Sequence, residues 1–305
     1  MANPYFGDFG DVLKHLMLTE LLSIERPRAY WETHAGSARY ALTRSDARNY
    51  GVYHFLEHAG RWPVLRASRY HTLLDRLPHV DGSPGVYPGS ALLAMLELGT
   101  EVQTYLLCDR DPASVADLEA AARDCGVAAQ ARCLATDGVA TILGEATDST
   151  APPLEQVLVH IDPFDPFEQS GPSGLSPFEL ACWLSERGCK VIYWYAYDQT
   201  APGAGGSGWA WRAFAKRVQD ADHSAWCGDI GLSALAMGGV AADVECGGGC
   251  GLVCANFARV AYERVSLLGE ALAELYAGSV FSTGQRGALT FRTFGVNPAV
   301  GTSGT

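Results

Sequence analysis

The amino-acid sequence predicts an α/β fold in which helices cover a parallel sheet. Three observations indicate this fold. Short apolar runs rich in β-branched and aromatic residues recur along the chain, helix-like segments separate them, and several runs end at an acidic residue. Strands buried on both faces of a parallel sheet have this composition. The expected strands cover residues 28–33, 102–108, 131–134, 157–161 and 190–196.

The composition is that of a soluble globular protein. The chain has 305 residues, of which 48% are hydrophobic and 18% charged, which suits one large α/β domain or two small ones. No run approaches the roughly 18 apolar residues that a membrane span requires. The first residues also lack the basic region of a secretory signal. Nine cysteines without a disulfide-framework spacing fit a reducing cytoplasm, so we expect a cytoplasmic protein.

Three cysteines, Cys246, Cys250 and Cys254, recur every fourth residue and raise the question of a metal site. Structural zinc sites favour close cysteine pairs and four ligands. Cys254 instead falls in an apolar run, residues 251–257, which we expect to form a late strand paired with residues near 230–240. Buried cysteine is commonly a small apolar side chain, so we expect no metal.

Polar residues follow several of the expected strands. The first strand is followed by the tight turn His34–Ala38, whose small residues let the backbone approach a ligand. The second strand ends in Asp109, at the position where a carboxylate commonly binds a pair of ribose hydroxyls. The third is followed by Asp137 and Gly138. The carboxyl ends of parallel strands meet at one sheet edge, so we expect these residues to form a ligand site.

The fourth strand ends in a distinctive turn, Asp162-Pro163-Phe164-Asp165-Pro166-Phe167. It resembles motif IV of the amino-methylating, S-adenosylmethionine-dependent methyltransferases, written Asp/Asn-Pro-Pro-aromatic. In those enzymes the first residue holds the target amine and the aromatic residue stacks on the base. The repeated Asp-Pro-Phe allows two registers, beginning at Asp162 or at Asp165. We prefer Asp162, because it directly follows the apolar strand; the alternative interpretation is an ordinary proline-rich loop.

Residues 47–86 interrupt the alternation of strands and helices and predict a helical insertion. We therefore divide the chain into residues 1–46 and 87–296, which form the main domain, the insertion 47–86, and a flexible tail, 297–305. Although the chain carries a net charge of −12, the window 39–76 holds seven arginines against three acids, with tyrosines and a tryptophan between them. Arginine with aromatic residues suits contacts to RNA phosphates and bases; a solvated helical surface is equally expected. The candidate RNA contacts are Arg44, Arg48, Arg61, Arg66 and Arg69.

Taken together, the motifs resemble one family, the bacterial 23S ribosomal RNA adenine-N6 methyltransferases of the RlmJ type. The resemblance covers residues 5–260 approximately. It rests on the family's motifs in their usual order: Asp11-Val12-Leu13-Lys14-His15, Thr33-His34-Ala35-Gly36 with Arg39-Tyr40, Tyr87-Pro88-Gly89-Ser90, Asp109, Asp137-Gly138 and Ile161-Asp162-Pro163. Two motifs depart from the family's pattern: Glu32 replaces an aspartate, and Phe164-Asp165 replaces Pro-Tyr.

The resemblance implies a Rossmann-like methyltransferase fold that binds S-adenosylmethionine. The cofactor-contacting residues that it implies are His15, His34, Ser90, Asp109, Asp137, Gly138 and Asp162. Asp162 would orient the acceptor amine, and Phe164 or Phe167 would stack on the base. Our first hypothesis is methylation of an adenine in 23S rRNA. The second is a methyltransferase of the same descent acting on a small molecule or peptide. The third is a non-catalytic relative that binds the cofactor or RNA.

Overall fold

The computed structural model describes residues 6–77, 79–80, 83–165, 167–169, 171, 174–197, 209–232, 249–277 and 289–296. Its helices are α1 (Phe9–Glu25), α2 (Asp46–Arg48), η1 (Asn49–Tyr53), α3 (His54–His58), η2 (Ala59–Arg61), α4 (Pro63–Arg66), α5 (Arg69–Asp75), α6 (Ser90–Leu98), η3 (Gly99–Glu101), α7 (Pro112–Asp124), α8 (Gly138–Thr147), η4 (Leu154–Gln156), α9 (Pro177–Ser185), α10 (Trp209–Asp220) and α12 (Arg259–Tyr276). Within the described ranges, no helix combines the length and apolar character needed to cross a bilayer.

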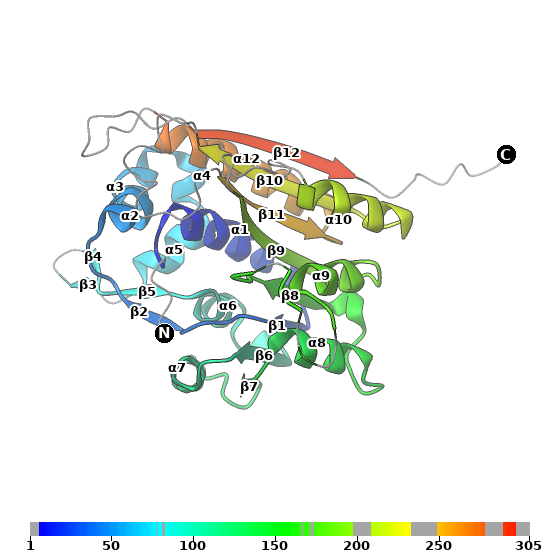
Figure 1. The fold of residues 1–305 in the computed structure, drawn as a ribbon. Helices are drawn as coiled ribbons and strands as arrows, with labels where there is room; N and C mark the ends of the chain where they lie inside the picture. Colours follow the sequence, from blue (N-terminus) through cyan, green and yellow to red (C-terminus); the bar gives the residue numbers. More distant parts are fainter. Residues whose placement is uncertain are drawn as a thin grey trace.

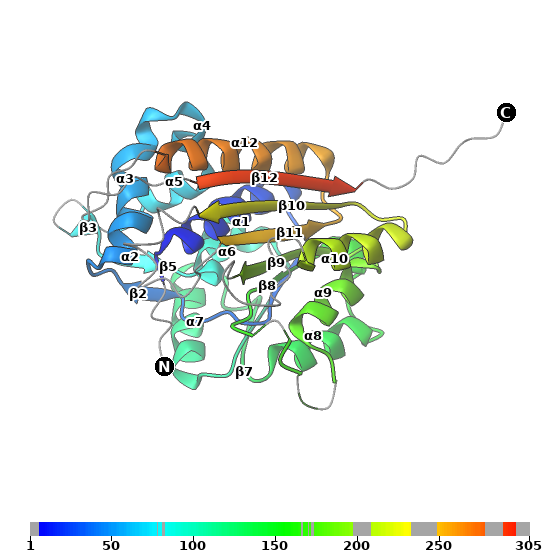
Figure 2. The ribbon, with the colours of Figure 1, turned by 45° about the horizontal axis from the view of Figure 1, so that its top comes forward.

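The strands are β1 (Ala29–Glu32), β2 (Arg39–Ala41), β3 (His79–Val80), β4 (Ser83–Pro84), β5 (Val86–Pro88), β6 (Thr104–Asp109), β7 (Ala131–Ala135), β8 (Val157–Ile161), β9 (Lys190–Tyr197), β10 (Ala225–Leu232), β11 (Gly249–Ala255) and β12 (Leu289–Val296). Eight of them form one sheet in the order β12-β10-β11-β9-β8-β1-β6-β7 (Figures 1 and 2). Strands β7, β6, β1, β8 and β9 run parallel to one another. Antiparallel pairing then joins β11 to β9, β10 to β11 and β12 to β10. The five expected parallel strands and the α/β class are thereby confirmed.

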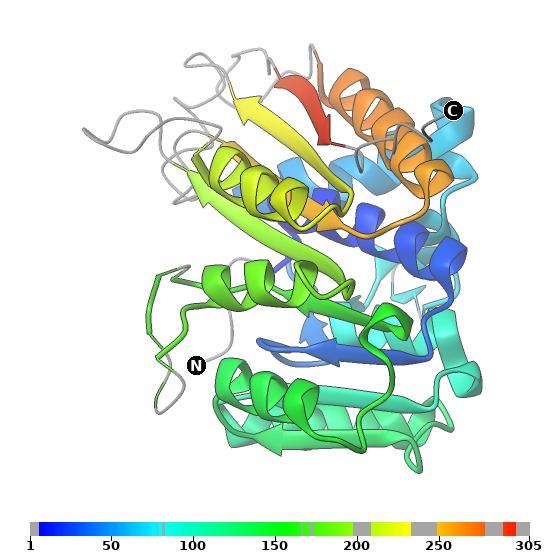
Figure 3. The ribbon, with the colours of Figure 1, turned by 90° about the vertical axis from the view of Figure 1, so that its right-hand side faces the viewer.

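The inner strands β1, β6 and β8 of the parallel part are buried on both faces, which explains their nearly continuous apolar sequences, whereas the edge strand β7 is only partly buried. Along β8, Val157, Val159 and Ile161 pack into one hydrophobic cluster, and Leu158 packs into the other. The first cluster lies under α8, α9 and α10. The second lies under α1, α6, α7 and α12, and Figure 3 shows α9 and α10 on the opposite side of the sheet from α1 and α12.

The amino-terminal helix α1 lies in the middle of the second cluster. Asp8 caps its amino end by accepting a hydrogen bond from the backbone of Asp11, and Arg26 ends it in the left-handed conformation. Leu13, Leu16 and Met17 are completely buried. The same helix buries Lys14 and His15. A lysine buried inside a helix needs a charged partner, and that partner belongs to the functional site described below.

The expected insertion is largely helical, with short helices and one π-helical turn between residues 46 and 75. A small ribbon, in which β2 pairs with β5, closes it at both ends. The aromatic residues of this segment differ from expectation. Tyr50 and Tyr70 are buried, and Tyr50 packs against Tyr276 of α12 at a ring distance of 5.2 Å. These tyrosines therefore attach the insertion to the main domain, because their rings supply apolar area to its core, and they do not form a surface for stacking bases.

In the carboxyl-terminal part, the pairing of one strand differs from the expectation. The late strand β11 was expected to pair with residues near 230–240, but its partner β10 begins earlier, at Ala225. The edge strand β12 was not anticipated. The expected tail, residues 297–305, lies outside the described residues, and so does Cys246.

Gly138 offers a test of how tightly the first and third strand ends are packed. A β-carbon at Gly138 would lie 2.0 Å from the backbone oxygen of Thr33, whereas one at Gly144 in the same helix would meet nothing within 4 Å. We expect Gly138→Ala to lower the free energy of unfolding by ~1–3 kcal/mol, as overpacking does. Gly144→Ala should raise it by up to ~1 kcal/mol through helix propensity. Urea unfolding of both variants checks this, and equal effects would contradict the tight packing.

Candidate functional site

The site lies at the carboxyl ends of the parallel strands, where the strand order changes direction at β1. Strand β1 pairs with β8 on one side and with β6 on the other. The turn after β1 is tied to both neighbours, since Thr33 donates its backbone N–H to His160 at 3.2 Å and Ala35 donates to Cys108 at 2.9 Å. In open α/β sheets, ligands bind in the crevice at such a switch point.

A cavity of about 170 Å³ occupies this crevice. It is lined by Thr33, His34, Asp109, Arg110, Asp137, Gly138, Phe164, Asp165, Glu168 and Pro177. Four of the expected cofactor residues thus meet in one place: His34, Asp109, Asp137 and Gly138. The cavity is smaller than the ~300–1,000 Å³ of typical ligand pockets. A complete cofactor would therefore have to displace exposed side chains at its rim, of which Phe164 is 88% exposed.

Asp109 already holds two loops together. One carboxylate oxygen accepts the backbone N–H of Gly36 at 2.8 Å, and the other accepts that of Asp111 at 2.8 Å. Gly36 adopts a positive φ of 58°, and a β-carbon there would lie 2.5 Å from the Tyr40 hydroxyl, so glycine is required at this close approach. Each carboxylate oxygen has a further lone pair, so each can accept one more hydrogen bond.

Asp137 caps helix α8 and contacts Arg110. One of its oxygens accepts the backbone N–H of Ala140 at 2.9 Å, and the other accepts from the Arg110 guanidinium at 2.7 Å. Arg110 also reaches Glu168 across the cavity at 3.4 Å. It is the only cation in a lining that holds four acidic side chains. His34 adds no positive charge, because burial lowers its pKa. The cavity therefore carries negative charge.

Asp162 lies beside this cavity and is bound by the buried lysine of α1. Lys14 Nζ lies 2.6 Å from the Asp162 carboxylate and 2.7 Å from that of Asp11, and the three side chains are 7–19% exposed. Burial would lower the pKa of Lys14, but the two carboxylates raise it above its ordinary value. In turn, Lys14 offsets the effect of burial on Asp11 and lowers the pKa of that carboxyl. The lysine therefore stays charged and keeps the Asp11 carboxylate charged.

The loop after Asp162 gives its residues different roles. The Asp165 carboxylate accepts the backbone N–H of Phe167 at 2.8 Å and that of Glu168 at 3.2 Å, which stabilises the turn. The Phe167 ring lies 6.3 Å from that of Phe178 in α9. Phe164 extends into solvent at the rim of the cavity. Asp165 thus lines the cavity and supports the turn, whereas Asp162 is paired with Lys14 and is not part of the lining. The register that begins at Asp162 stays a prediction.

His15 and Ser90, the two other expected cofactor residues, lie below the cavity and do not line it. His15 is 2% exposed, its Nδ1 lies 2.9 Å from the Tyr87 hydroxyl, and burial lowers its pKa to about 3. The Ser90 hydroxyl donates to Glu32. Glu32 also contacts the ring of His160 at 2.8 Å, and both are completely buried. Because β1 and β8 are neighbours, this pair connects the two strands beneath the site.

Sequence reasoning missed several of these residues. Lys14 departs from the apolar stripe of its helix, and a lysine in a buried helix is a usable signal. Arg110 directly follows Asp109 and gave no signal of its own. Within the described residues, no three histidine, cysteine or acidic side chains form a group that could hold a metal ion.

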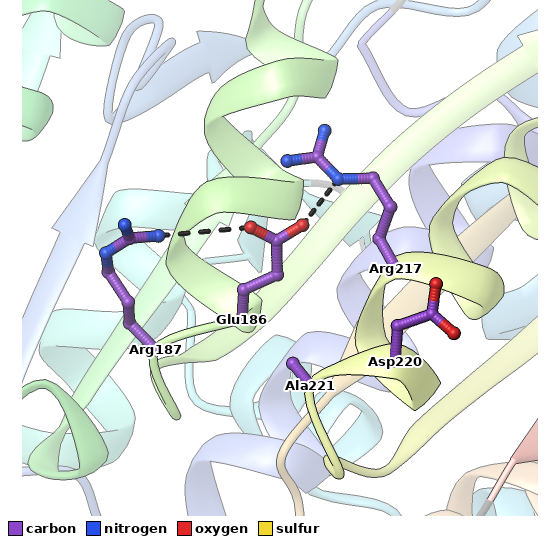
Figure 4. Close-up of a pocket in the computed structure, with 5 residues that line it drawn as sticks. All are labelled: Glu186, Arg187, Arg217, Asp220 and Ala221. Carbon is purple, nitrogen blue, oxygen red and sulfur yellow. Dashed lines mark hydrogen bonds and ion pairs between the residues drawn. The ribbon is translucent and has the colours of Figure 1, made fainter.

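A larger hollow of about 470 Å³ lies at the opposite edge of the sheet, between the carboxyl ends of α9 and α10 (Figure 4). Glu186 accepts a hydrogen bond from Arg217 at 2.5 Å and lies 3.9 Å from Arg187. The charges of this hollow are largely paired with each other, and the residues expected to bind a ligand are elsewhere. We therefore place the candidate site at the smaller cavity.

Comparisons with known proteins show likeness at the level of the fold. No family model matches the chain, and no curated protein matches it in sequence. Among solved structures, it is similar to the crystal structure of protein LPL1258 from Legionella pneumophila str. Philadelphia 1, described as a DUF519 protein. The TM-score is 0.69 at 19% sequence identity, and the match covers 97% of this chain and 99% of that one. The two proteins therefore have a similar fold over nearly their whole length.

Asp8 makes the stability of this region depend on pH. Burial and the nearby charge of Asp11 raise the pKa of Asp8 to about 7. A raised pKa means that its stabilising contribution is present below about pH 4 and is lost as pH rises through 7. We expect Asp8→Asn, which keeps the helix cap, to unfold in urea with ~1–4 kcal/mol more stability than the wild type at pH 8.

The difference in unfolding free energy between Asp8→Asn and the wild type should disappear near pH 4. Asp8→Ala serves as the control, because it removes the charge and the cap together and should cost about 1 kcal/mol relative to Asp8→Asn at every pH. If Asp8→Asn and the wild type show parallel pH profiles, folding does not raise the pKa of Asp8 and the proposed charge crowding at the start of α1 is absent.

Proposed function

We propose that this protein is an S-adenosylmethionine-dependent N-methyltransferase with a Rossmann-like methyltransferase fold, acting on the exocyclic amine of an adenine in 23S rRNA. One observation carries the proposal. A carboxylate at the end of β8, Asp162, is held by Lys14 beside an exposed aromatic ring, Phe164, which borders the cavity formed by Asp109, Asp137 and their neighbours. The DUF519 likeness supports the fold only.

The sheet topology supports this assignment. Numbered along the chain, the five parallel strands have the spatial order 3-2-1-4-5, as in nucleotide-binding α/β folds. The cofactor would then lie across the ends of β1, β6 and β7. Asp109 would accept the ribose hydroxyls, and Asp137 would accept from the adenine amino group once Arg110 has moved from it. S-adenosylmethionine, when bound, supplies an electrophilic methyl group.

The residues of the acceptor side suit positioning. One oxygen of Asp162 binds Lys14, and the other oxygen can accept an amine N–H. Holding the amine in this way directs its lone pair at the methyl group, and such orientation is the main contribution of the enzyme to an in-line transfer. Phe164 can stack on an unstacked base.

The charges around Asp162 also favour an aromatic amine. Asp8, Asp11 and Asp162 lie near one cation, Lys14. Such surroundings stabilise an alkylammonium ion, which has no lone pair to attack with, and so they disfavour a lysine-like acceptor. The exocyclic amine of adenine is neutral at pH 7 and needs no deprotonation before transfer.

A small-molecule acceptor is the second candidate, and the acidic lining of the cavity favours it. Four carboxylates against one arginine repel phosphate groups. An RNA acceptor must therefore have its phosphates bound at some distance from the cavity, whereas a neutral or cationic small molecule has no such requirement.

Substitution of Asp162 tests the acceptor role. We expect Asp162→Asn to reduce the turnover of methyl transfer to 23S rRNA from a strain lacking this gene by about 100-fold or more, because the amine loses its orientation. Cofactor affinity should change by less than about threefold, since Asp109 and Asp137 remain. The measurements are a labelled-methyl transfer assay and calorimetry.

Asp165→Asn is the matched control, and its turnover should fall by less than about tenfold, because Asp165 supports a turn. Loss of activity with Asp165→Asn together with tolerance of Asp162→Asn would show that the motif begins three residues later. If the wild type methylates no nucleic acid but does methylate small amines, the second candidate is correct.

Cofactor binding has its own test at Asp109. Calorimetry with S-adenosylmethionine should show that Asp109→Ala weakens binding by about 1–3 kcal/mol, the range for a lost hydrogen bond to a charged group. Urea unfolding of the same variant reports the separate loss of the two backbone hydrogen bonds. Unchanged affinity in a folded variant would remove Asp109 from the site.

A further inference from the structure

The arginines of the window 39–76 fall into two groups. Arg39 is paired with Asp117 and Asp124, and Arg69 is paired with Glu97. Within the described part of the chain, no carboxylate lies within ion-pair distance of the others, which are Arg44, Arg48, Arg61, Arg66 and Arg76. The local positive charge therefore comes from this second group.

Arg44 and Arg48 differ from the rest of that group because neutral partners hold them in place. The Arg44 guanidinium lies 4.2 Å from the centre of the Tyr53 ring and donates to Asn49 at 3.2 Å. The Arg48 guanidinium lies 4.5 Å from the centre of the Phe6 ring. It also donates to the backbone oxygen and the hydroxyl of Thr43, at 2.6 and 3.2 Å.

These contacts orient both guanidinium groups without neutralising them. A guanidinium has five N–H donors in a planar fork, and the hydrogen bonds to Asn49 and Thr43 use only part of them. Each guanidinium carbon lies over a neutral aromatic ring, so that the group is held without loss of its charge. A pair of preoriented, uncompensated arginines matches the oxygens of a phosphate group and loses little conformational entropy on binding.

A chain of contacts connects Arg48 to the site. Phe6, below Arg48, stacks on Tyr40 at a ring distance of 4.9 Å. The Tyr40 hydroxyl accepts the backbone N–H of Ser37 at 2.9 Å, and Ser37 follows Gly36, which is bound to Asp109. Arg48 thus lies a few side-chain layers from the cavity, on the far side of Tyr40, and Arg44 precedes it by four residues.

We propose that Arg44 and Arg48 form a clamp for the backbone phosphates of single-stranded RNA whose unstacked base enters the cavity. The clamp rests on the proposed RNA acceptor. It resolves the charge conflict of that proposal, because the neutral base meets the acidic cavity and the phosphates meet the arginines. In this proposal, the positive charge of the insertion contacts RNA through two side chains, Arg44 and Arg48.

Fluorescence anisotropy with a labelled 12-nucleotide single-stranded RNA tests the clamp. Removal of two phosphate contacts should lower the slope of log affinity against log salt by ~1.4. For Arg44→Gln/Arg48→Gln we therefore expect about 25-fold weaker binding at 0.1 M salt and about fivefold at 0.3 M. Arg61→Gln/Arg66→Gln is the matched control, since it removes the same charge from the same segment, and it should change affinity by less than about threefold.

Three outcomes would overturn the clamp: equal losses in both double variants, no RNA binding by the wild type, or tighter binding of a polyglutamate peptide than of RNA. Arg44→Lys/Arg48→Lys keeps the charge and loses the fork, so its salt slope should stay near that of the wild type, and it replaces the glutamine variant if that fails to fold. Calorimetry with S-adenosylmethionine separates the proposals. If the wild type binds S-adenosylmethionine and the Arg44→Gln/Arg48→Gln variant binds RNA as well as the wild type does, only the clamp is rejected. If the wild type does not bind S-adenosylmethionine but the double variant binds RNA more weakly as expected, only the methyltransferase proposal is rejected.

Discussion

Lys14 is a buried cation between two carboxylates, and the geometry of the site depends on it. It joins Asp11 of its own helix to Asp162 at the end of β8. Removal of one partner from a buried ion pair leaves an uncompensated charge, which destabilises a protein by roughly 3–5 kcal/mol. Helix α1 is therefore fixed to the sheet edge at the point where the loop after β8 begins.

The same helix relates the site to the insertion. Asp8 caps α1, and the residue before it, Gly7, accepts the backbone N–H of Val52 in η1 at 2.9 Å. Phe6 continues the contact to Tyr40 and Arg48. Residues 6–8 thus touch the insertion, strand β2 and the start of α1. Phe6, which lies under Arg48, is two residues before the Asp8 cap of the helix that carries Lys14.

The parallel strands could be predicted from sequence because each is a short apolar run, and the acids after them followed from the rule for strand ends. Asp109, Asp137 and Gly138 accordingly meet in one cavity. The pairing of Lys14 with Asp162 could not be predicted, because it joins residues 148 positions apart. The tyrosines of the insertion were misassigned since composition does not distinguish a buried ring from an exposed one. Tyr50 is buried against Tyr276 of α12, far along the chain, and Tyr70 packs against His15 of α1 and Phe55.

Charge divides the surface around the site into two chemically different parts. The cavity presents four carboxylates and one arginine, while Arg44 and Arg48 have no acidic partners among the described residues. The first part repels phosphate and the second attracts it, and in the proposed function a flat neutral base enters the first next to Phe164. A single-stranded polynucleotide carries both kinds of group at regular spacing. The net charge of −12 is therefore compatible with RNA binding, because recognition depends on the local field at the contact and less on the sum over the chain.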